Sequence, residues 1–344
     1  TDAAVHAASL ALSGPAGGVV GAAVVARALD IARALTIDIG GTSADVGLIM
    51  DGEPLVEPGG MIADVPIAMP RVLVETVSAG GGSIAAVDAG GALRVGPRSA
   101  GAVPGPVALG RGGTQPTLTD AHVALGRISA THMSGGVTLD AKAALGALEG
   151  LARQLRQPVA RVADAVVATA DATMARALRR VSVERGIDPR DCTLIAFGGA
   201  GPLHACGLAE LLGIRRVIVP PHAGSFSALG LALTSERREV MSSVMQGLAG
   251  WDRIDRARVM RALAEQLPRE LRHRSWIARM RYEGQGHELD GCLTPTASNA
   301  RIAGAFETAH RDRFGFTLPR PQEVVSVRHV AQGTARAVTF SGKR

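Results

Sequence analysis

The sequence has little lysine and few aromatic residues. Only Lys142 and Lys343 are lysines among its 37 basic residues, and aromatic residues make up 3% of its 344 positions. Proteins that bind single-stranded nucleic acid stack bases on aromatic side chains, so this scarcity argues against such a ligand. The formal charge of +6 is carried by scattered arginines. The dense basic stretch between Pro268 and Arg281 is interpreted as a solvated helix face rather than a site for nucleic acid or an acidic partner.

Several catalytic signatures are absent too. The sequence contains no GxxxxGK[ST], which excludes a Walker-type nucleotide-binding loop, and no GxSxG or HExxH, which excludes the usual serine hydrolases and zinc proteases. Its cysteines, Cys192, Cys206 and Cys292, form no CxxC pair. This pattern indicates a reducing compartment without structural zinc or disulfides, and therefore a cytoplasmic protein.

An uncharged run at 7–26 has the length of a membrane span. Pro15 and several small residues interrupt this run, and Arg27 and Asp30 follow it at once. We therefore interpret the segment as a buried glycine turn followed by a helix, and we expect no association with membranes. The missing initiator Met predicts a processed chain or a fragment.

Glycine is abundant, at 43 positions. Because glycine costs backbone entropy in helices and strands, its positions indicate turns and close approaches. Residues 35–50, LTIDIGGTSADVGLIM, predict a strand, a tight turn and a second strand, with Asp38 and Asp45 on either side of the turn. Main-chain N–H groups and hydroxyls of such a turn can bind phosphate, and the two carboxylates can organise Mg²⁺; a plain hairpin turn is the alternative. The predicted phosphate-binding residues are Gly40, Gly41, Thr42 and Ser43.

A second glycine loop follows a later strand. Residues 191–221 predict a strand, a glycine loop, a helix and a strand, which is a crossover between parallel strands. Open α/β sheets bind ligands at the C-terminal ends of their strands, where this loop lies. An ordinary strand-to-helix turn explains the loop equally well, and His204 is interpreted as a hydrogen-bonded structural residue rather than a catalyst. The glycines predicted to seat adenosine are Gly198, Gly199 and Gly201.

Residues 78–83, SAGGGS, are too rich in glycine for an ordinary strand. We predict that Gly80, Gly81 and Gly82 lie beneath a ligand or against another backbone, with a flexible linker as the alternative.

Residues 111–122 bring together a cation, hydroxyls, a carboxylate and an imidazole. Arg111 is a candidate for charge neutralisation during catalysis. Asp120 is interpreted either as a helix N-cap or as a catalytic carboxylate. His122 is interpreted either as a helix-surface residue or as a metal ligand.

The order of the predicted elements indicates an α/β protein. Residues 139–185 have helical periodicity and predict two or three consecutive helices. From about residue 236 the sequence becomes more charged, with a strand-like segment at 276–293 and a helix at 299–314. We therefore predict an ATPase-like domain at 1–235 and a smaller C-terminal α+β domain at 236–344.

Collinear motifs from residue 13 to residue 235 closely resemble the hydantoinase A/5-oxoprolinase family, which includes N-methylhydantoinase components and the β-type subunits of acetone carboxylases. Residues after 235 resemble the C-terminal domain of the family more loosely. The motifs are SGPAGGVVGA (13–22), DIGGTSADVGLI (38–49), SAGGGSIAAVD (78–88), GPRSAGAVPGP (96–106), RGGTQPTLTDA (111–121), VSVERGIDPRD (181–191), AFGGAGPLHA (196–205) and VPPHAGSFSALGL (219–231).

The resemblance implies an actin-like, sugar-kinase-like fold of the ribonuclease H type, with ATP bound between two lobes. It implies that the DIGGT stretch binds phosphate, that the AFGGAGP stretch seats adenosine, and that Mg²⁺ and an arginine neutralise charge. The resemblance also implies phosphorylation of the oxygen of a cyclic amide or ketone, so that a hydantoinase B-like partner can attack the activated carbon in a hetero-oligomer. The catalytic residues carried over are Asp38, Asp45, Arg111 and Asp120.

The chain also departs from the family pattern. Full-length relatives carry an earlier domain with its own DxGGT-like loop, and this sequence begins after that domain. The family usually has Thr where Ala44 stands, an aromatic residue near Leu109 and Asn where His122 stands. Two functions therefore remain open: a component of an ATP-dependent cyclic amide hydrolase or acetone carboxylase-type enzyme, and a non-catalytic nucleotide-binding or assembly subunit or truncated remnant.

Overall fold

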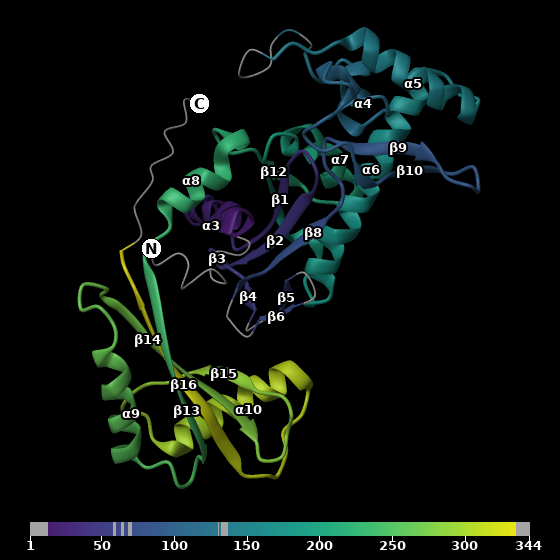
Figure 1. Cartoon of the computed structure of the whole chain (residues 1–344). Coiled ribbons are helices and arrows are strands. Elements are labelled where there is room, and N and C mark those ends of the chain that lie inside the picture. The colour runs from purple at the N-terminus through teal and green to yellow at the C-terminus, as the bar shows by residue number, and fades with distance from the viewer. Residues whose placement is uncertain are drawn as a thin grey trace. The chain divides into compact units, whose positions relative to one another are not determined.

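A computed structural model describes residues 13–57, 60–62, 65–67, 71–129, 131 and 137–334 (Figure 1). The described residues divide into two compact units, the first running to Thr234 and the second beginning at Ser235. The first unit is an α/β structure built on a six-stranded sheet, and the second is a smaller α+β structure built on a four-stranded sheet. The predicted fold class is therefore confirmed.

The sheet of the first unit has the strand order β12-β11-β1-β2-β3, and β8 also pairs with β2. The strands β1, β11 and β12 are parallel, whereas β2 runs antiparallel to β1, β3 and β8. This mixed order, with an antiparallel hairpin continued by parallel crossover strands, is that of an actin-like, ribonuclease H-type lobe. The strands are β1 (Arg33–Ile39), β2 (Ala44–Met50), β3 (Glu53–Pro54), β8 (Val74–Val77), β11 (Thr193–Phe197) and β12 (Arg216–Ile218).

Helices cover both faces of this sheet (Figure 1). On one face, α6 (Val159–Val183) and α7 (Gly201–Leu212) pack against Leu35 and Ile37 of β1. On the other face, α3 (Ser13–Ala28) packs against Ala34. Because both faces are buried, β11 is a nearly continuous apolar run, TLIAF. The predicted strand, loop, helix and strand at 191–221 are confirmed as β11, α7 and parallel β12.

Smaller elements extend this unit. Strand β9 (Ser83–Val87) pairs with β10 (Leu93–Ser99), and the predicted helices at 139–185 are α5 (Ala141–Leu155) and α6. The remaining elements are β4 (Val56–Glu57) with β7 (Arg71–Val72), β5 (Gly60–Ile62) with β6 (Val65–Ile67), the 3-10 helices η1 (Val107–Leu109), η3 (Pro189–Asp191) and η4 (Ala223–Ser225), and the helices α4 (Leu118–Ala124) and α8 (Phe226–Leu233).

The glycines at the start of the uncharged run lie in a helix, so the predicted glycine turn was wrong. Helix α3 begins at Ser13, and Pro15 is tolerated because it lies in the first turn. The glycines allow α3 to approach α8 closely: a Cβ on Gly230 would lie 1.9 Å from the carbonyl oxygen of Gly17. In the part of the chain that the structure describes, no helix combines the length and apolar character needed to cross a bilayer.

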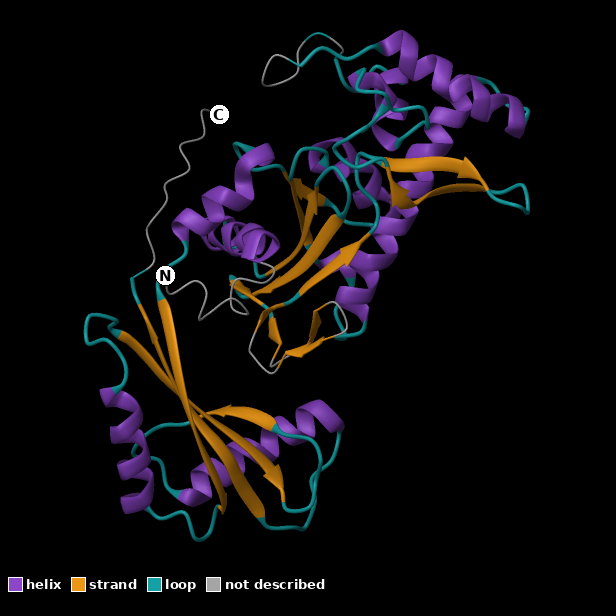
Figure 2. Cartoon of the chain, viewed as in Figure 1, coloured by secondary structure: helices purple, strands orange, loops and turns teal. Residues whose placement is uncertain are grey.

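The sheet of the second unit has the order β13-β16-β14-β15, with antiparallel neighbours (Figure 2). Its core lies on one face, where Met280 and Tyr282 of the sheet meet Met260 of α9 and Phe306 of α10. The predicted helix at 299–314 is confirmed. The elements are β13 (Arg237–Gly247), α9 (Arg253–Glu265), β14 (His273–Tyr282), β15 (Leu289–Cys292), α10 (Asn299–Phe314) and β16 (Gln322–Gln332).

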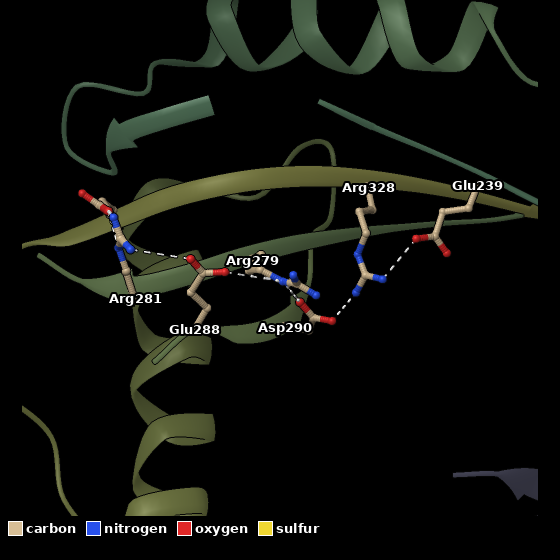
Figure 3. Close-up of polar contacts among 7 residues, drawn as sticks. Glu239, Arg279, Arg281, Glu288, Asp290 and Arg328 are labelled. Atoms are coloured by element: carbon tan, nitrogen blue, oxygen red, sulfur yellow. Dashed lines mark hydrogen bonds and ion pairs between the residues drawn. The ribbon is translucent and has the colours of Figure 1, made fainter. Parts of the chain in front are cut away.

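The opposite face of this sheet carries a network of ion pairs (Figure 3). Arg279 contacts Asp290 at 2.9 Å, and Arg328 pairs with both Asp290 and Glu239. Arg279 and Arg281 alternate along β14 with apolar residues of the core, which is the periodicity of a strand with one buried face. The interpretation of the basic stretch as a solvated helix face was therefore wrong, because its later arginines lie on a strand and pair with carboxylates.

Candidate functional site

The predicted phosphate turn connects β1 to β2, as expected. The N–H of Gly40 donates to the carbonyl oxygen of Ser43 at 3.0 Å and closes the turn. Gly40, Gly41 and Thr42 are exposed, and a Cβ on Gly41 would meet no heavy atom within 4 Å. The outer side of the turn therefore faces open space in which an anion could reach main-chain N–H groups and the Thr42 hydroxyl.

Two carboxylates stand side by side directly below this turn. Strand pairing places Asp38 of β1 opposite Asp45 of β2, and Asp45 opposite Thr76 of β8. Paired residues of neighbouring strands point to the same face of a sheet, so the three side chains form a row. The Thr76 hydroxyl donates to Asp45 Oδ1 at 2.5 Å.

The carboxyl group of Asp45 has a raised pKa. Burial raises the pKa of Asp45 above its ordinary value, the hydrogen bond from Thr76 opposes this rise, and the negative charge of Asp38 adds to it. Two like charges on adjacent strands repel each other. A cation between Asp38 and Asp45 would relieve this repulsion, so the pair has the chemistry of a cation site.

The second glycine loop meets the first at Asp38. Gly198 has φ of +83°, and a Cβ on it would lie 2.2 Å from Asp38 Oδ1. The N–H of Ala200 donates to the carbonyl oxygen of Ile39 at 3.0 Å. Gly199 is exposed, with no heavy atom within 4 Å of the position of a Cβ, whereas Gly201 is buried against β1 and β11. The structure thus brings together the two loops that the sequence placed far apart in the chain.

A serine that the sequence analysis missed completes this arrangement. Ser227 of α8 donates its hydroxyl hydrogen bond to Asp38 Oδ2 at 2.7 Å. Neither Ser227 nor Thr76 was predicted, because each reaches its carboxylate through tertiary packing or strand register. Strand pairing, which no local pattern of the sequence fixes, places Thr76 beside Asp45.

The SAGGGS segment lies against another backbone, which is one of its two predicted environments. The N–H groups of Gly81 and Gly82 donate to the carbonyl oxygens of Gly40 and Gly41 at 3.0 and 2.6 Å. A Cβ on Gly80 would lie 2.6 Å from the nitrogen of Ser43. These buried glycines support the phosphate turn through main-chain hydrogen bonds, so the flexible-linker interpretation was wrong.

Sequence comparison decides the family. A model of the hydantoinase/oxoprolinase family matches residues 1–240. The chain belongs to the hydantoinase/oxoprolinase family. The resemblance predicted from the motifs is therefore confirmed.

Characterised relatives of this hydantoinase/oxoprolinase chain include caprolactamase subunit alpha from Pseudomonas jessenii, which is 34% identical over 335 residues covering 92% of this chain and 48% of the relative. The 5-oxoprolinase 1 of Arabidopsis thaliana is 37% identical over 243 residues, covering 64% of this chain and 19% of the relative. A nucleotide-free structure of acetone carboxylase aligns with a TM-score of 0.76 at 26% identity, covering 93% of this chain and 49% of that one. The chain therefore spans about half the length of the caprolactamase subunit and a smaller share of the 5-oxoprolinase.

Asp120 of this family member serves a structural purpose. The N-cap of α4 is Thr117, and Asp120 lies at the third helical position, where the two residues form a capping box. The Asp120 carboxylate is fully buried and also accepts the N–H groups of Val107 and Ala108 at 3.2 and 2.7 Å. The N-cap interpretation of Asp120 was therefore wrong, because the N-cap is Thr117, three residues earlier. These hydrogen bonds give no support to a catalytic role for Asp120.

Arg111 lies exposed in the loop before α4. Among the described residues, no hydrogen bond or ion pair joins Arg111 to Asp38 or Asp45. Its role in charge neutralisation stays a prediction.

The two histidines form a buried chain with Asp171. His204 Nδ1 lies 2.5 Å from Asp171 Oδ1, and His204 Nε2 lies 3.1 Å from His122 Nε2. His204 is buried and hydrogen-bonded, as predicted. The helix-surface interpretation of His122 was wrong because its side chain is buried. Within the described ranges no three His, Cys, Asp or Glu side chains gather as a metal site, so the metal-ligand interpretation of His122 has no support. The three residues join α6, α7 and α4.

We predict that His122 makes the protein less stable in acid. Burial, together with the nearby His204 and Arg127, lowers the pKa of His122 from 6.5 to about 3. Below pH 6.5 the unfolded chain therefore binds a proton at this residue that the folded chain does not bind, so stability falls as the pH falls. Between pH 7 and pH 5 this difference amounts to about 2 kcal/mol. Urea denaturation of the wild type and of His122→Asn should show a shallower loss of stability in the variant.

The matched control is His222→Asn. His222 is exposed and has φ of +57°, a conformation that asparagine tolerates. The control should keep the pH dependence of the wild type. Parallel stability curves for the wild type and His122→Asn would contradict the assignment.

Proposed function

We propose that this chain is the nucleotide-binding part of an ATP-dependent enzyme that phosphorylates a cyclic amide of the hydantoin or 5-oxoproline type and so activates it for ring opening. The proposal rests on one observation: Asp38 and Asp45 lie side by side where the two glycine loops meet. Phosphoryl transfer depends on positioning and on neutralisation of charge. A paired carboxylate site beside bare backbone turns fits both requirements.

The residues present fit Mg²⁺. Mg²⁺ is commonly held by one or two carboxylates together with substrate phosphates and water, and Asp38 and Asp45 supply two carboxylates. Each uses one oxygen for a hydroxyl hydrogen bond, from Ser227 and Thr76 respectively. When bound, Mg²⁺ would supply positive charge to the phosphate oxygens. The protein itself orients the two carboxylates. Glycine at position 198 leaves room for the Asp38 carboxylate, because any side chain there would collide with it.

The two loops fit the two ends of ATP. The turn between β1 and β2 would bind phosphate through main-chain N–H groups and hydroxyls, and the loop before α7 would receive adenosine on its open side at Gly199. Arg111 would help to neutralise the transferred phosphoryl group. The proposed phosphate-binding residues are Gly40, Gly41, Thr42 and Ser43, and those at the adenosine end are Gly198, Gly199 and Gly201.

The names of the relatives support the substrate class. Caprolactamase is described as ATP-dependent, and caprolactam and 5-oxoproline are both lactams. The caprolactamase relative is also a subunit of a larger enzyme. We therefore infer a hydantoinase B-like partner in a hetero-oligomer, and a cytoplasmic location, with which the free Cys192 and Cys206 are compatible.

The test is ADP release by the full-length protein with Mg-ATP, the hydantoinase B-like partner and, in turn, hydantoin, 5-oxoproline or caprolactam. We expect one lactam or imide to stimulate ADP release and to be opened. Isothermal titration should show binding of Mg-ATP without the partner. Absence of Mg-ATP binding by the full-length protein would overturn the proposal.

The similarity to acetone carboxylase supports a second candidate, a component that phosphorylates a ketone for carboxylation. ADP release that depends on acetone and bicarbonate, with no response to lactams, would favour it. Nucleotide binding without any substrate-stimulated turnover would favour a non-catalytic assembly subunit.

A further inference from the structure

The two carboxylates at the site share an unusual set of partners. Asp38 accepts a hydrogen bond from the Ser227 hydroxyl, and Asp45 accepts one from the Thr76 hydroxyl. Among the residues described, no arginine or lysine lies within ion-pair distance of either carboxylate. Elsewhere the chain readily pairs its acids with arginine, as in Asp188 with Arg190. The pair therefore receives neutral donors only, and its negative charge is not compensated by the protein.

The hydroxyl of Ser227 is held in place by the packing of α8. Gly230 of α8 contacts Gly17 of α3, and Phe226 packs against Phe197, with ring centroids 4.9 Å apart. A Cβ on Gly18 would lie 2.8 Å from Ser227 Oγ, so glycine at this position leaves room for the hydroxyl. The serine is therefore presented to Asp38 by a closely packed helix pair.

The hydroxyl of Thr76 is held in place by strand register. Thr76 lies directly opposite Asp45, and a β-branched side chain has few rotamers in a strand. The two hydroxyls come from different elements, one from α8 and the other from β8.

We propose that Ser227 and Thr76 are positioning residues that fix one oxygen of each carboxylate and leave the other oxygens and the uncompensated charge to a divalent cation. This inference rests on the proposed function, because the cation would be the one that accompanies ATP. A hydroxyl orients a carboxylate without neutralising it, whereas an arginine in the same place would compete with the cation. Loss of a residue that orients a metal ligand typically weakens metal affinity by about 10- to 100-fold.

The experiment measures Mn²⁺ binding to the nucleotide-free, full-length protein by the EPR signal of free Mn²⁺. Ser227→Ala and Thr76→Val should each weaken Mn²⁺ binding by about tenfold. Ser227→Thr, which restores a hydroxyl, should recover most of the affinity. Ser225→Ala is the matched control, because Ser225 is exposed two positions away and its hydroxyl makes only a 3.4 Å contact with the carbonyl oxygen of His222. Circular dichroism of each variant checks that it is folded.

A merely structural role would lower melting temperature and leave metal affinity of the folded protein unchanged. Wild-type Mn²⁺ affinity in folded Ser227→Ala and Thr76→Val would therefore overturn the inference while Mg-ATP binding, measured separately, still supports the proposed function. Mn²⁺ binding that persists in Asp38→Asn would place the ion elsewhere and would also overturn the inference. Loss of Mg-ATP binding by the wild type, in contrast, counts against the proposed function itself.

Discussion

Replacing Asp38 with asparagine is expected to reduce ATP hydrolysis by about a hundredfold or more, which is the usual scale for removing a group that stabilises charge in a transition state. The substitution keeps the size of the side chain and its hydrogen bond to Ser227 but removes one of the two negative charges of the pair. It should also relieve the repulsion at Asp45, so the pKa of Asp45 should fall. Steady-state ADP release at saturating Mg²⁺, with the partner and substrate present, measures the effect.

The control for Asp38→Asn is Asp51→Asn. Asp51 follows β2 outside the carboxylate row and has φ of +50°, which asparagine accepts. This variant should retain wild-type activity. If Asp38→Asn hydrolysed ATP at the wild-type rate, the carboxylate pair could not be the cation site.

Replacing Gly198 with alanine is expected to destabilise the protein and to disrupt nucleotide binding together. The backbone of Gly198 has φ of +83°, where a side chain costs about 1–2 kcal/mol in strain. The new Cβ would also lie 2.2 Å from Asp38 Oδ1 and 2.7 Å from the nitrogen of Ile39. Strand β1 cannot move away without losing its pairing with β11, and the Asp38 carboxylate cannot move away without disturbing its hydrogen bond from Ser227. We expect a loss of about 3 kcal/mol in unfolding free energy, including overpacking, and at least tenfold weaker Mg-ATP binding.

The neighbouring Gly199 provides the stability control. A Cβ there would meet no heavy atom within 4 Å, so Gly199→Ala should change the free energy of unfolding by less than about 1 kcal/mol. Chemical denaturation of both variants measures the difference. Equal stability of the two variants would show that the Gly198 loop adopts another conformation.

Local patterns were sufficient to predict the elements that surround the site. The alternation of apolar residues around the Gly40 turn predicted the hairpin of β1 and β2, and the strand, loop and helix pattern at 191–221 predicted a parallel crossover. Parallel pairing of β1 with β11 then brings Asp38 beside Phe197 and hence beside Gly198. Their proximity follows from topology, which the family resemblance supplied.

The errors arose where tertiary packing decides the role of a residue. Glycines usually mark turns, but Gly17 lies inside a helix because a second helix passes within contact of its backbone. Charged residues usually mark solvated faces, but Arg279 lies on a strand and pairs with Glu288 and Asp290 at the neighbouring strand β15. Burial of His122 depends on α6 and α7, which are distant in sequence. None of these environments can be read from a local window.

The separation of Asp38 and Asp45 is a property of the main chain. Neighbouring strands in a sheet lie about 4.8 Å apart, and the ladder between β1 and β2 fixes that gap for the two acids. The distance between the main chains of β1 and β2 at these two residues is therefore insensitive to side-chain substitutions around them. A change in the ion preference of the proposed cation site would require longer or shorter acids, or different hydroxyl partners, because the spacing itself can change only if the two strands separate.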